Sequence, residues 1–158
     1  MSQPRLTYDA FARIAPVAQQ SLIAMGRQAD ESGIDKQIIE LVKLRVSQLN
    51  NCAFCLQIHL NVSRKLGLPQ EKLDLVATWE EAGIFSEREC AALAWAETLT
   101  RLVGHSVPDA AYEAVRRHFS EEEVTFLSVS IATINAWNRL GAAFRFAPPI
   151  LKAIRPPT

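Results

Sequence analysis

Residues 40–59 read ELVKLRVSQLNNCAFCLQIH, and this stretch predicts two helices joined by a short turn. Apolar residues recur at helical spacing before Asn50, which predicts a helix over residues 35–48. Asn50 and Asn51 form a turn, because asparagine tolerates left-handed backbone conformations. A second helix begins near Cys52 and ends before Gly67, a typical helix-terminating glycine. We therefore expect a helical hairpin centred on the two asparagines.

The rest of the chain also predicts helices. They cover residues 7–30, 69–81 and 108–119, and the first of these can break at Pro16. Two more helices are expected after the capping boxes at Ser86 and Ser120. Six glycines and the absence of Asn-Gly or Asp-Gly pairs argue against β-hairpins. The prediction is an all-α fold, a compact bundle of about seven helices.

One domain is expected over residues 1–158, with a core from about residue 6 to 147 and a proline-rich arm over 148–158. The last predicted helix is apolar around most of its circumference, which indicates burial on nearly every side, in part by another subunit. We therefore expect an oligomer.

The composition is that of an ordinary globular domain. Lys plus Arg and Asp plus Glu both total 17 of 158 residues, and 49% of residues are hydrophobic. The balanced charge favours neither nucleic acid nor an anionic membrane as a partner. No signal peptide or membrane-spanning stretch is recognisable, so the cytoplasm is the expected location.

Two of the three cysteines form the motif Cys52-Ala53-Phe54-Cys55, and His59 follows one turn later. Positions i, i+3 and i+7 lie on one face of a helix. Cys52 lies at the helix start, where free N–H groups and the macrodipole favour a thiolate. His59 is close enough to Cys55 to exchange a proton.

Glu40 is the acidic residue that we expect beside this face. In an antiparallel hairpin, Glu40 and His59 both lie roughly 12–13 Å from the turn at about 1.5 Å rise per residue. A hydrogen bond between them would hold the imidazole in one tautomer and raise its basicity.

These four residues suggest a redox mechanism without a cofactor. Cys55, deprotonated through His59 and Glu40, attacks a peroxide and becomes a sulfenic acid. Cys52 condenses with it to a disulfide, and an external dithiol restores both thiols. The apolar neighbours Phe54, Leu56 and Ile58 could limit water at the reacting sulfur, or simply pack.

Other interpretations compete with this one. Cys52, Cys55, His59 and Glu40 could instead bind zinc, in a metal-binding or regulatory helical protein. A thioredoxin-like enzyme is disfavoured because no strand is predicted.

Several residues are expected to lie outside the chemistry. Cys90 is predicted to be a buried, inert thiol. Trp79, Trp95 and Trp137 are expected to anchor the core or an interface. Three polar residues lie near the end of the last predicted helix: Asn135, Asn138 and Arg139. They either satisfy buried backbone groups or make a subunit contact.

The chain resembles the alkylhydroperoxidase D family, within the carboxymuconolactone decarboxylase superfamily. The resemblance rests on Glu40, then eleven residues, then the Cys52-X-X-Cys55 motif with His59. It also includes the late motif Asn135-Ala136-Trp137-Asn138-Arg139, and it extends from about residue 6 to 148.

This resemblance implies an all-helical trimer or hexamer that acts on organic hydroperoxides and takes electrons from an external dithiol or thiol protein. It assigns peroxide attack to Cys55, resolution to Cys52 and the proton relay to Glu40 and His59. The best-known members have a histidine directly before the second cysteine, where this chain has Phe54. The decarboxylases of the superfamily lack the cysteine pair, so lactone chemistry is not expected.

Overall fold

A computed structural model describes residues 3–150, and within this range the chain is helical without any strand. The elements in chain order are α1 (Tyr8–Ile14), α2 (Pro16–Asp30), α3 (Lys36–Leu49), α4 (Ala53–Lys65), α5 (Gln70–Leu75), the 3₁₀ helix η1 (Val76–Thr78), α6 (Trp79–Ala82), α7 (Glu87–Thr100), α8 (Asp109–Arg116) and α9 (Glu121–Phe144). The all-α prediction is confirmed.

Two of the predicted helices are divided. The helix expected over residues 7–30 breaks at Ala15, because Pro16 has no N–H to donate and takes the first position of α2 instead. The helix expected over residues 69–81 consists of α5, η1 and α6. Both predicted capping boxes, at Ser86 and Ser120, are present.

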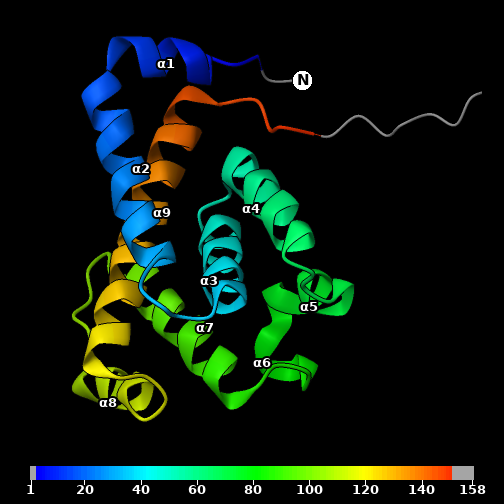
Figure 1. Ribbon diagram of the computed structural model, residues 1–158, viewed down its shortest axis with the longest axis vertical. Coiled ribbons are helices and arrows are strands. Elements are labelled where there is room, and N and C mark those ends of the chain that lie inside the picture. Colours follow the sequence, from blue (N-terminus) through cyan, green and yellow to red (C-terminus); the bar gives the residue numbers. More distant parts are fainter. Residues whose placement is uncertain (1–2, 151–158) are drawn as a thin grey trace, which may run out of the picture.

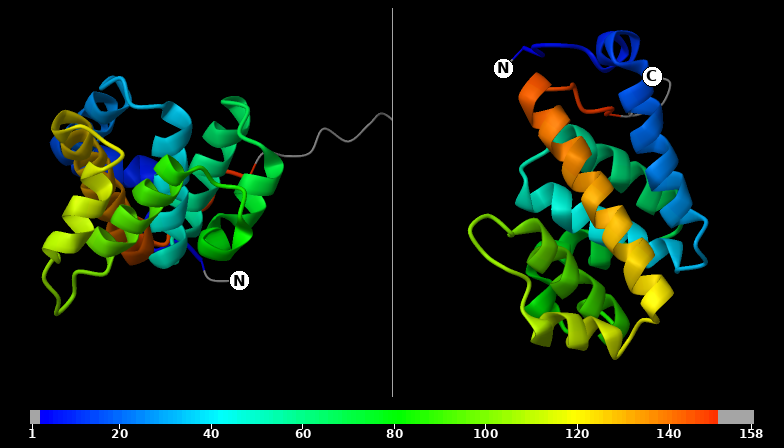
Figure 2. Two further views of the ribbon diagram at one scale, coloured as in Figure 1. Left: turned by 90° about the horizontal axis from the view of Figure 1, so that it is seen from below. Right: turned by 90° about the vertical axis from the view of Figure 1, so that its left-hand side faces the viewer.

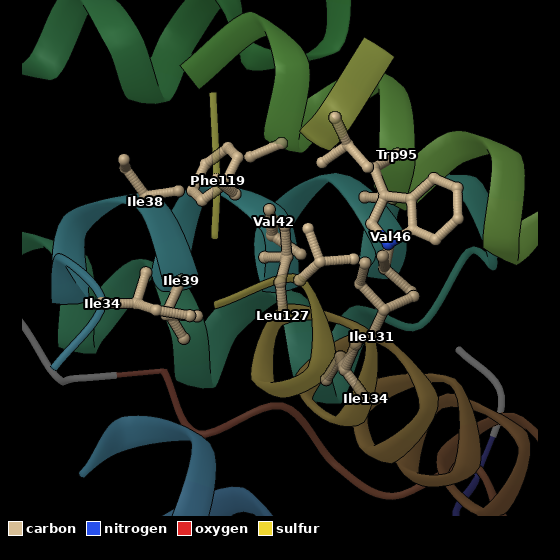
Figure 3. Close-up of a cluster of buried hydrophobic side chains, with 14 of the residues drawn as sticks. Ile34, Ile38, Ile39, Val42, Val46, Trp95, Phe119, Leu127, Ile131 and Ile134 are labelled. Carbon is tan, nitrogen blue, oxygen red and sulfur yellow. The ribbon is translucent and has the colours of Figure 1, made fainter. Parts of the chain in front are cut away.

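Helix α3 lies at the centre of the molecule (Figure 1), against α4, α7 and α9. One side of it, with Val42 and Val46, packs on Leu127 and Ile131 of α9, as Figure 3 shows. Leu41 and Leu44 on the other side belong to a second apolar cluster under α5 and η1. Because α3 is covered on both sides, three of its polar side chains are buried inside the protein: Glu40, Lys43 and Ser47.

Helices α2 and α9 run side by side in opposite directions (Figure 2). The start of the chain meets the end of α9, where the N–H groups of Arg5 and Leu6 donate to Phe144 O at 2.9 and 3.2 Å. Helix α9 contacts α2, α3, α4, α7 and α8, so the chain itself covers most of its circumference. The predicted subunit contact remains a prediction.

The predicted C-terminal arm lies largely outside the described residues, which end at 150. Within its described part, Pro149 O accepts a hydrogen bond from Asn61 Nδ2 at 3.1 Å, which holds this segment against α4. None of the helices in the described range is long and apolar enough to span a membrane.

A buried carboxylate joins α3 to α7. Glu97 on α7 accepts from Arg45 Nε at 2.6 Å, from Trp79 Nε1 at 3.0 Å and from an Arg101 guanidinium nitrogen at 2.8 Å. Burial would raise the pKa of Glu97, but the hydrogen bonds from Trp79 and Arg45 and the charge of Arg101 lower it below its ordinary value. Glu97 therefore stabilises the fold in its ionised form.

We expect Glu97→Gln to lower the free energy of unfolding at neutral pH by about 2 kcal/mol, because the half-buried Arg45 loses its charged acceptor. A lowered carboxyl pKa stabilises the fold above the unfolded pKa of about 4.3 and loses that effect as the pH falls through the folded pKa. Urea titrations between pH 7 and pH 3 should therefore converge for the variant and the wild type in acid. Glu113→Gln, at an exposed position of α8, is the control. A difference independent of pH would contradict the assignment.

Candidate active site

The backbone around Cys52 prepares a sulfur site at the start of α4. Asn51 adopts the left-handed conformation with φ 52°, as expected for the turn, and Cys52 N–H donates to Ser47 O at 3.0 Å. Cys52 is the N-cap residue, and its Sγ accepts from Cys55 N–H at 3.4 Å. A sulfur atom thus takes the place that serine or aspartate oxygen takes at most helix starts.

The two sulfurs lie 2.6 Å apart as free thiols, and both residues are almost fully buried. The sulfur–sulfur hydrogen bond with Cys55, together with backbone N–H groups and the Asn138 side chain, lowers the pKa of Cys52 to about 7 despite burial. The hydrogen bond with Cys52, burial and the negative charge on Cys52 raise the pKa of Cys55. The two sulfurs share their titration, and the N–H groups at the start of α4 favour negative charge at Cys52.

Glu40 and His59 are in contact, as the hairpin geometry predicts. Glu40 Oε2 lies 2.8 Å from His59 Nδ1, and Glu40 Oε1 accepts from Lys43 Nζ at 3.1 Å. Burial would raise the pKa of Glu40, but the hydrogen bond and charge of His59 and the charge of Lys43 lower it. The carboxylate is therefore ionised and accepts at both oxygens.

Lys43 extends this network to α2. Its Nζ donates to Asp30 Oδ1 at 2.8 Å as well as to Glu40. Burial would lower the pKa of Lys43, but the charges of Glu40 and Asp30 raise it above its ordinary value. The lysine is thus a buried cation that keeps Glu40 ionised and ties α2 to α3.

Glu40, Lys43 and Ser47 form a buried polar stripe along α3, at positions i, i+3 and i+7. Each member meets a different helix: Glu40 meets α4, Lys43 meets α2, and Ser47 Oγ accepts from Asn138 Nδ2 of α9 at 3.2 Å. One face of the central helix therefore sets the positions of the three helices around the cysteines.

A largely apolar cavity of about 640 Å³ opens beside Cys55. Cys55 and His59 both line it, whereas Cys52 does not. Of the apolar neighbours of the cysteines, Phe54 and Ile58 line the cavity, and Leu56 packs on the second core cluster instead. The other lining residues are Tyr8, Leu22, Ile23, Gly26, Arg27, Asp30, Lys43, Ser130, Thr133, Ile134, Trp137 and Pro149.

Aromatic side chains from both ends of the chain surround Phe54, between the two cysteines. Tyr8 stacks on Phe54 at a centroid distance of 5.6 Å, and Phe146 meets it edge-on at 5.2 Å. Trp137 contacts Tyr8 at 6.1 Å. This cluster adds to the burial of the sulfurs, so charge near them is screened only weakly by solvent.

The alternative of a metal site finds little support in this geometry. Both carboxylate oxygens of Glu40 are occupied by Lys43 and His59, and the latter contact uses one of the two ring nitrogens. Over residues 3–150, no group of three or more His, Cys, Asp and Glu side chains is arranged to hold a metal ion.

Several residues of the site were not predicted from the sequence. Lys43 could have been suspected as a cation on the apolar stripe of a helix, and Gly141 as an isolated glycine inside a helix. Asp30 had no local signal. Asn138 is part of the late polar motif, and the structure places it between the cysteines, Ser47 and Asn50.

The structure also settles the positions of other predicted residues. Asn135 Nδ2 donates to Ile131 O at 3.0 Å, so satisfaction of buried backbone groups accounts for part of the late polar motif. Cys90 is only half-buried, which corrects the expected full burial, and burial and Glu89 raise the pKa of its thiol. Trp95 is a core residue, whereas Trp79 and Trp137 are partly exposed.

Comparisons with known proteins identify relatives in sequence and in fold. The uncharacterized protein YdfG of Bacillus subtilis is 36% identical over 134 residues, which are 85% of this chain and 91% of YdfG. A crystal structure from Agrobacterium tumefaciens, of a protein of unknown function with a suggested identity as the antioxidant defence protein AhpD, is 36% identical. It superposes with a TM-score of 0.87 over 94% of this chain and 100% of that one.

A more distant structure shares the fold. The AhpD-core, peroxidase-related protein of Ralstonia eutropha JMP134 is 23% identical, with a TM-score of 0.75 over 88% of this chain and 74% of that chain. The model of the carboxymuconolactone decarboxylase family matches residues 16–98, which include α2, α3, α4 and the cysteine motif. The chain therefore belongs to the carboxymuconolactone decarboxylase family and has the AhpD-like fold.

Proposed function

We propose that the protein is a thiol peroxidase that reduces organic hydroperoxides with Cys55 and is regenerated through a Cys52–Cys55 disulfide by an external dithiol or thiol protein. The observation that supports this best is a pair of buried sulfurs, 2.6 Å apart, beside a cavity that Cys55 and the Glu40-bound His59 line and Cys52 does not. An antioxidant role would agree with the suggested identity of the Agrobacterium relative.

His59 is the base for Cys55 in this proposal. Because Glu40 is ionised and accepts at both oxygens, the hydrogen between Glu40 Oε2 and His59 belongs to Nδ1. In the neutral imidazole, Nε2 is then the atom that can accept a proton. His59 follows Cys55 by one helical turn and lines the same cavity, so this proton can come from Cys55 directly or through one water.

The peroxide step balances with these groups. The Cys55 proton passes to His59, and the Cys55 thiolate attacks the outer oxygen of ROOH. The O–O bond breaks, and the leaving alkoxide takes the proton from His59 to become ROH. Cys55 is oxidised to a sulfenic acid while the peroxide is reduced.

The resolving step uses the lowered pKa of Cys52. Because N–H groups at the start of α4 donate to this sulfur and lower its pKa to about 7, Cys52 can ionise near neutral pH once Cys55 is a sulfenic acid. It attacks Cys55 Sγ, the S–S bond forms, the S–O bond breaks, and the hydroxide that leaves takes a proton from solvent. An external dithiol then reduces the disulfide by two exchange steps and is itself oxidised.

The cavity supports an organic peroxide as the substrate. Its volume of about 640 Å³ is far larger than a hydroperoxy group needs, and seven of its sixteen lining residues are leucine, isoleucine, tyrosine, phenylalanine or tryptophan. Burial of an apolar substrate body against these walls is favourable by about 25 cal/mol per Å².

We expect Cys55→Ser to abolish reduction of cumene hydroperoxide with dithiothreitol as reductant. Cys52→Ser should permit one oxidation and leave a sulfenic acid on Cys55, which dimedone traps and mass spectrometry detects. Cys90→Ser is the matched control and should keep wild-type turnover, because Cys90 lies outside the cavity. Full turnover by Cys55→Ser would refute the proposed roles.

Glu40→Gln should lower kcat/KM for cumene hydroperoxide by about 10²-fold, because His59 loses the ionised acceptor that fixes its tautomer. Glu89→Gln tests whether loss of any buried carboxylate has this effect, since Glu89 is also buried and paired with a lysine, Lys72, but is remote from the cavity. Equal losses in the two variants would remove Glu40 from the relay.

The thiolate absorbance of the reduced protein at 240 nm should rise with a midpoint at pH about 7, from Cys52. Since a depressed thiol pKa favours the charged form, the absorbance is gained as the pH rises through this value and lost below it. Asn138→Leu removes a donor to the sulfurs and should move the midpoint to higher pH. An unchanged midpoint would show that Asn138 does not stabilise the thiolate.

A further inference from the structure

We propose that Gly141 is a positioning residue for disulfide formation, because the missing side chain at this position leaves the space in which Cys52 Sγ lies beside Cys55. The proposal deepens the thiol peroxidase function and rests on it for its role in turnover. Its geometric basis can be tested without any peroxide.

Gly141 lies in α9, one turn beyond Asn138, and is buried where α9 meets the start of α4. A Cβ atom at this position would lie 2.7 Å from Cys52 Sγ and 3.5 Å from Cys55 Sγ. The first distance is far inside the ordinary contact distance of carbon and sulfur, whereas the second is an ordinary contact. An alanine would therefore displace mainly the sulfur of Cys52.

The backbone conformation does not explain a glycine at this position. Gly141 lies inside a regular helix and is not among the glycines with positive φ, which are Gly33, Gly67, Gly83 and Gly104. Alanine stabilises a helix relative to glycine, so this residue costs helix stability. The structure offers one compensation, which is room for the sulfur pair.

The space matters more for the disulfide than for the thiols. In the dithiol form, Cys52 can turn its side chain away from α9 to relieve a contact with an added methyl group. In the disulfide, Cys52 Sγ is bonded to Cys55 Sγ, and disulfide geometry permits little freedom. An alanine at position 141 should therefore disfavour the step in which Cys52 displaces hydroxide from the Cys55 sulfenic acid.

The first experiment measures the dithiol–disulfide equilibrium of Gly141→Ala in glutathione buffers, by alkylation of free thiols and mass spectrometry. We expect the equilibrium constant for disulfide formation to fall about tenfold, which corresponds to a potential about 30 mV more oxidising. Gly26→Ala is the matched control for this equilibrium, because it is also a helical glycine and its added Cβ would meet only Thr133 Cγ2 at 3.9 Å. A wild-type equilibrium constant for Gly141→Ala would overturn the proposal.

A single-turnover experiment connects the equilibrium to the peroxidase cycle. After one equivalent of cumene hydroperoxide, Gly141→Ala should accumulate more dimedone-trapped sulfenic acid on Cys55 than the wild type and form the disulfide more slowly. Equal rates of disulfide formation would contradict the role of Gly141. If the wild type itself consumed no peroxide, the thiol peroxidase function would fail, while the glutathione equilibrium would still decide the effect of Gly141.

A comparison of Tm with and without the Cys52 sulfur tests whether the effect of Gly141→Ala comes from contact with that sulfur. Gly141→Ala should lower Tm when Cys52 is present, but raise Tm in a Cys52→Ala background, where the sulfur is absent and only the helix preference remains. A variant that folds only in the Cys52→Ala background would support the same conclusion. A change of Tm in the same direction in both backgrounds, or failure to fold in both, would overturn it.

Discussion

The structure depends on the pairing of charges buried in its central helix. Removing a carboxylate and an ammonium from water is costly unless each finds close partners of opposite charge. Glu40 meets this requirement through Lys43 and His59, and Lys43 through Glu40 and Asp30. Since these partners come from α2, α3 and α4, the need for pairing also fixes His59 relative to the core.

The sulfur pair is held by different forces. Cys52 occupies a helix N-cap position, so its thiolate receives backbone N–H groups that an apolar helix start would leave without partners. Helix α9 completes the site with a donor, Asn138, and with the space at Gly141. The two sulfurs therefore differ in their surroundings: N–H donors favour negative charge at Cys52, while Cys55 lines the cavity.

The cavity and the aromatic cluster are built from segments far apart in the chain. Tyr8 from α1 and Phe146 from beyond α9 both pack on Phe54, and the start of the chain is held to Phe144 O by backbone hydrogen bonds. The position before the second cysteine is thus part of an apolar wall, which extends from the sulfurs into the cavity. In the proposed mechanism, His59 is therefore the imidazole available to Cys55.

Residues 40–59 are enough to predict the two helices of the hairpin, the turn at Asn51, the shared face of Cys52, Cys55 and His59, and the contact of Glu40 with His59. All of these follow from helical geometry over twenty residues, in which spacing alone sets direction and distance. Packing of the helices brings Asp30, Asn138 and Gly141 to the site and places Cys55, rather than Cys52, at the cavity. Periodicity identifies the buried face of a helix but not the helix that it meets, and a thiol pKa depends on contacts and burial that exist only after packing.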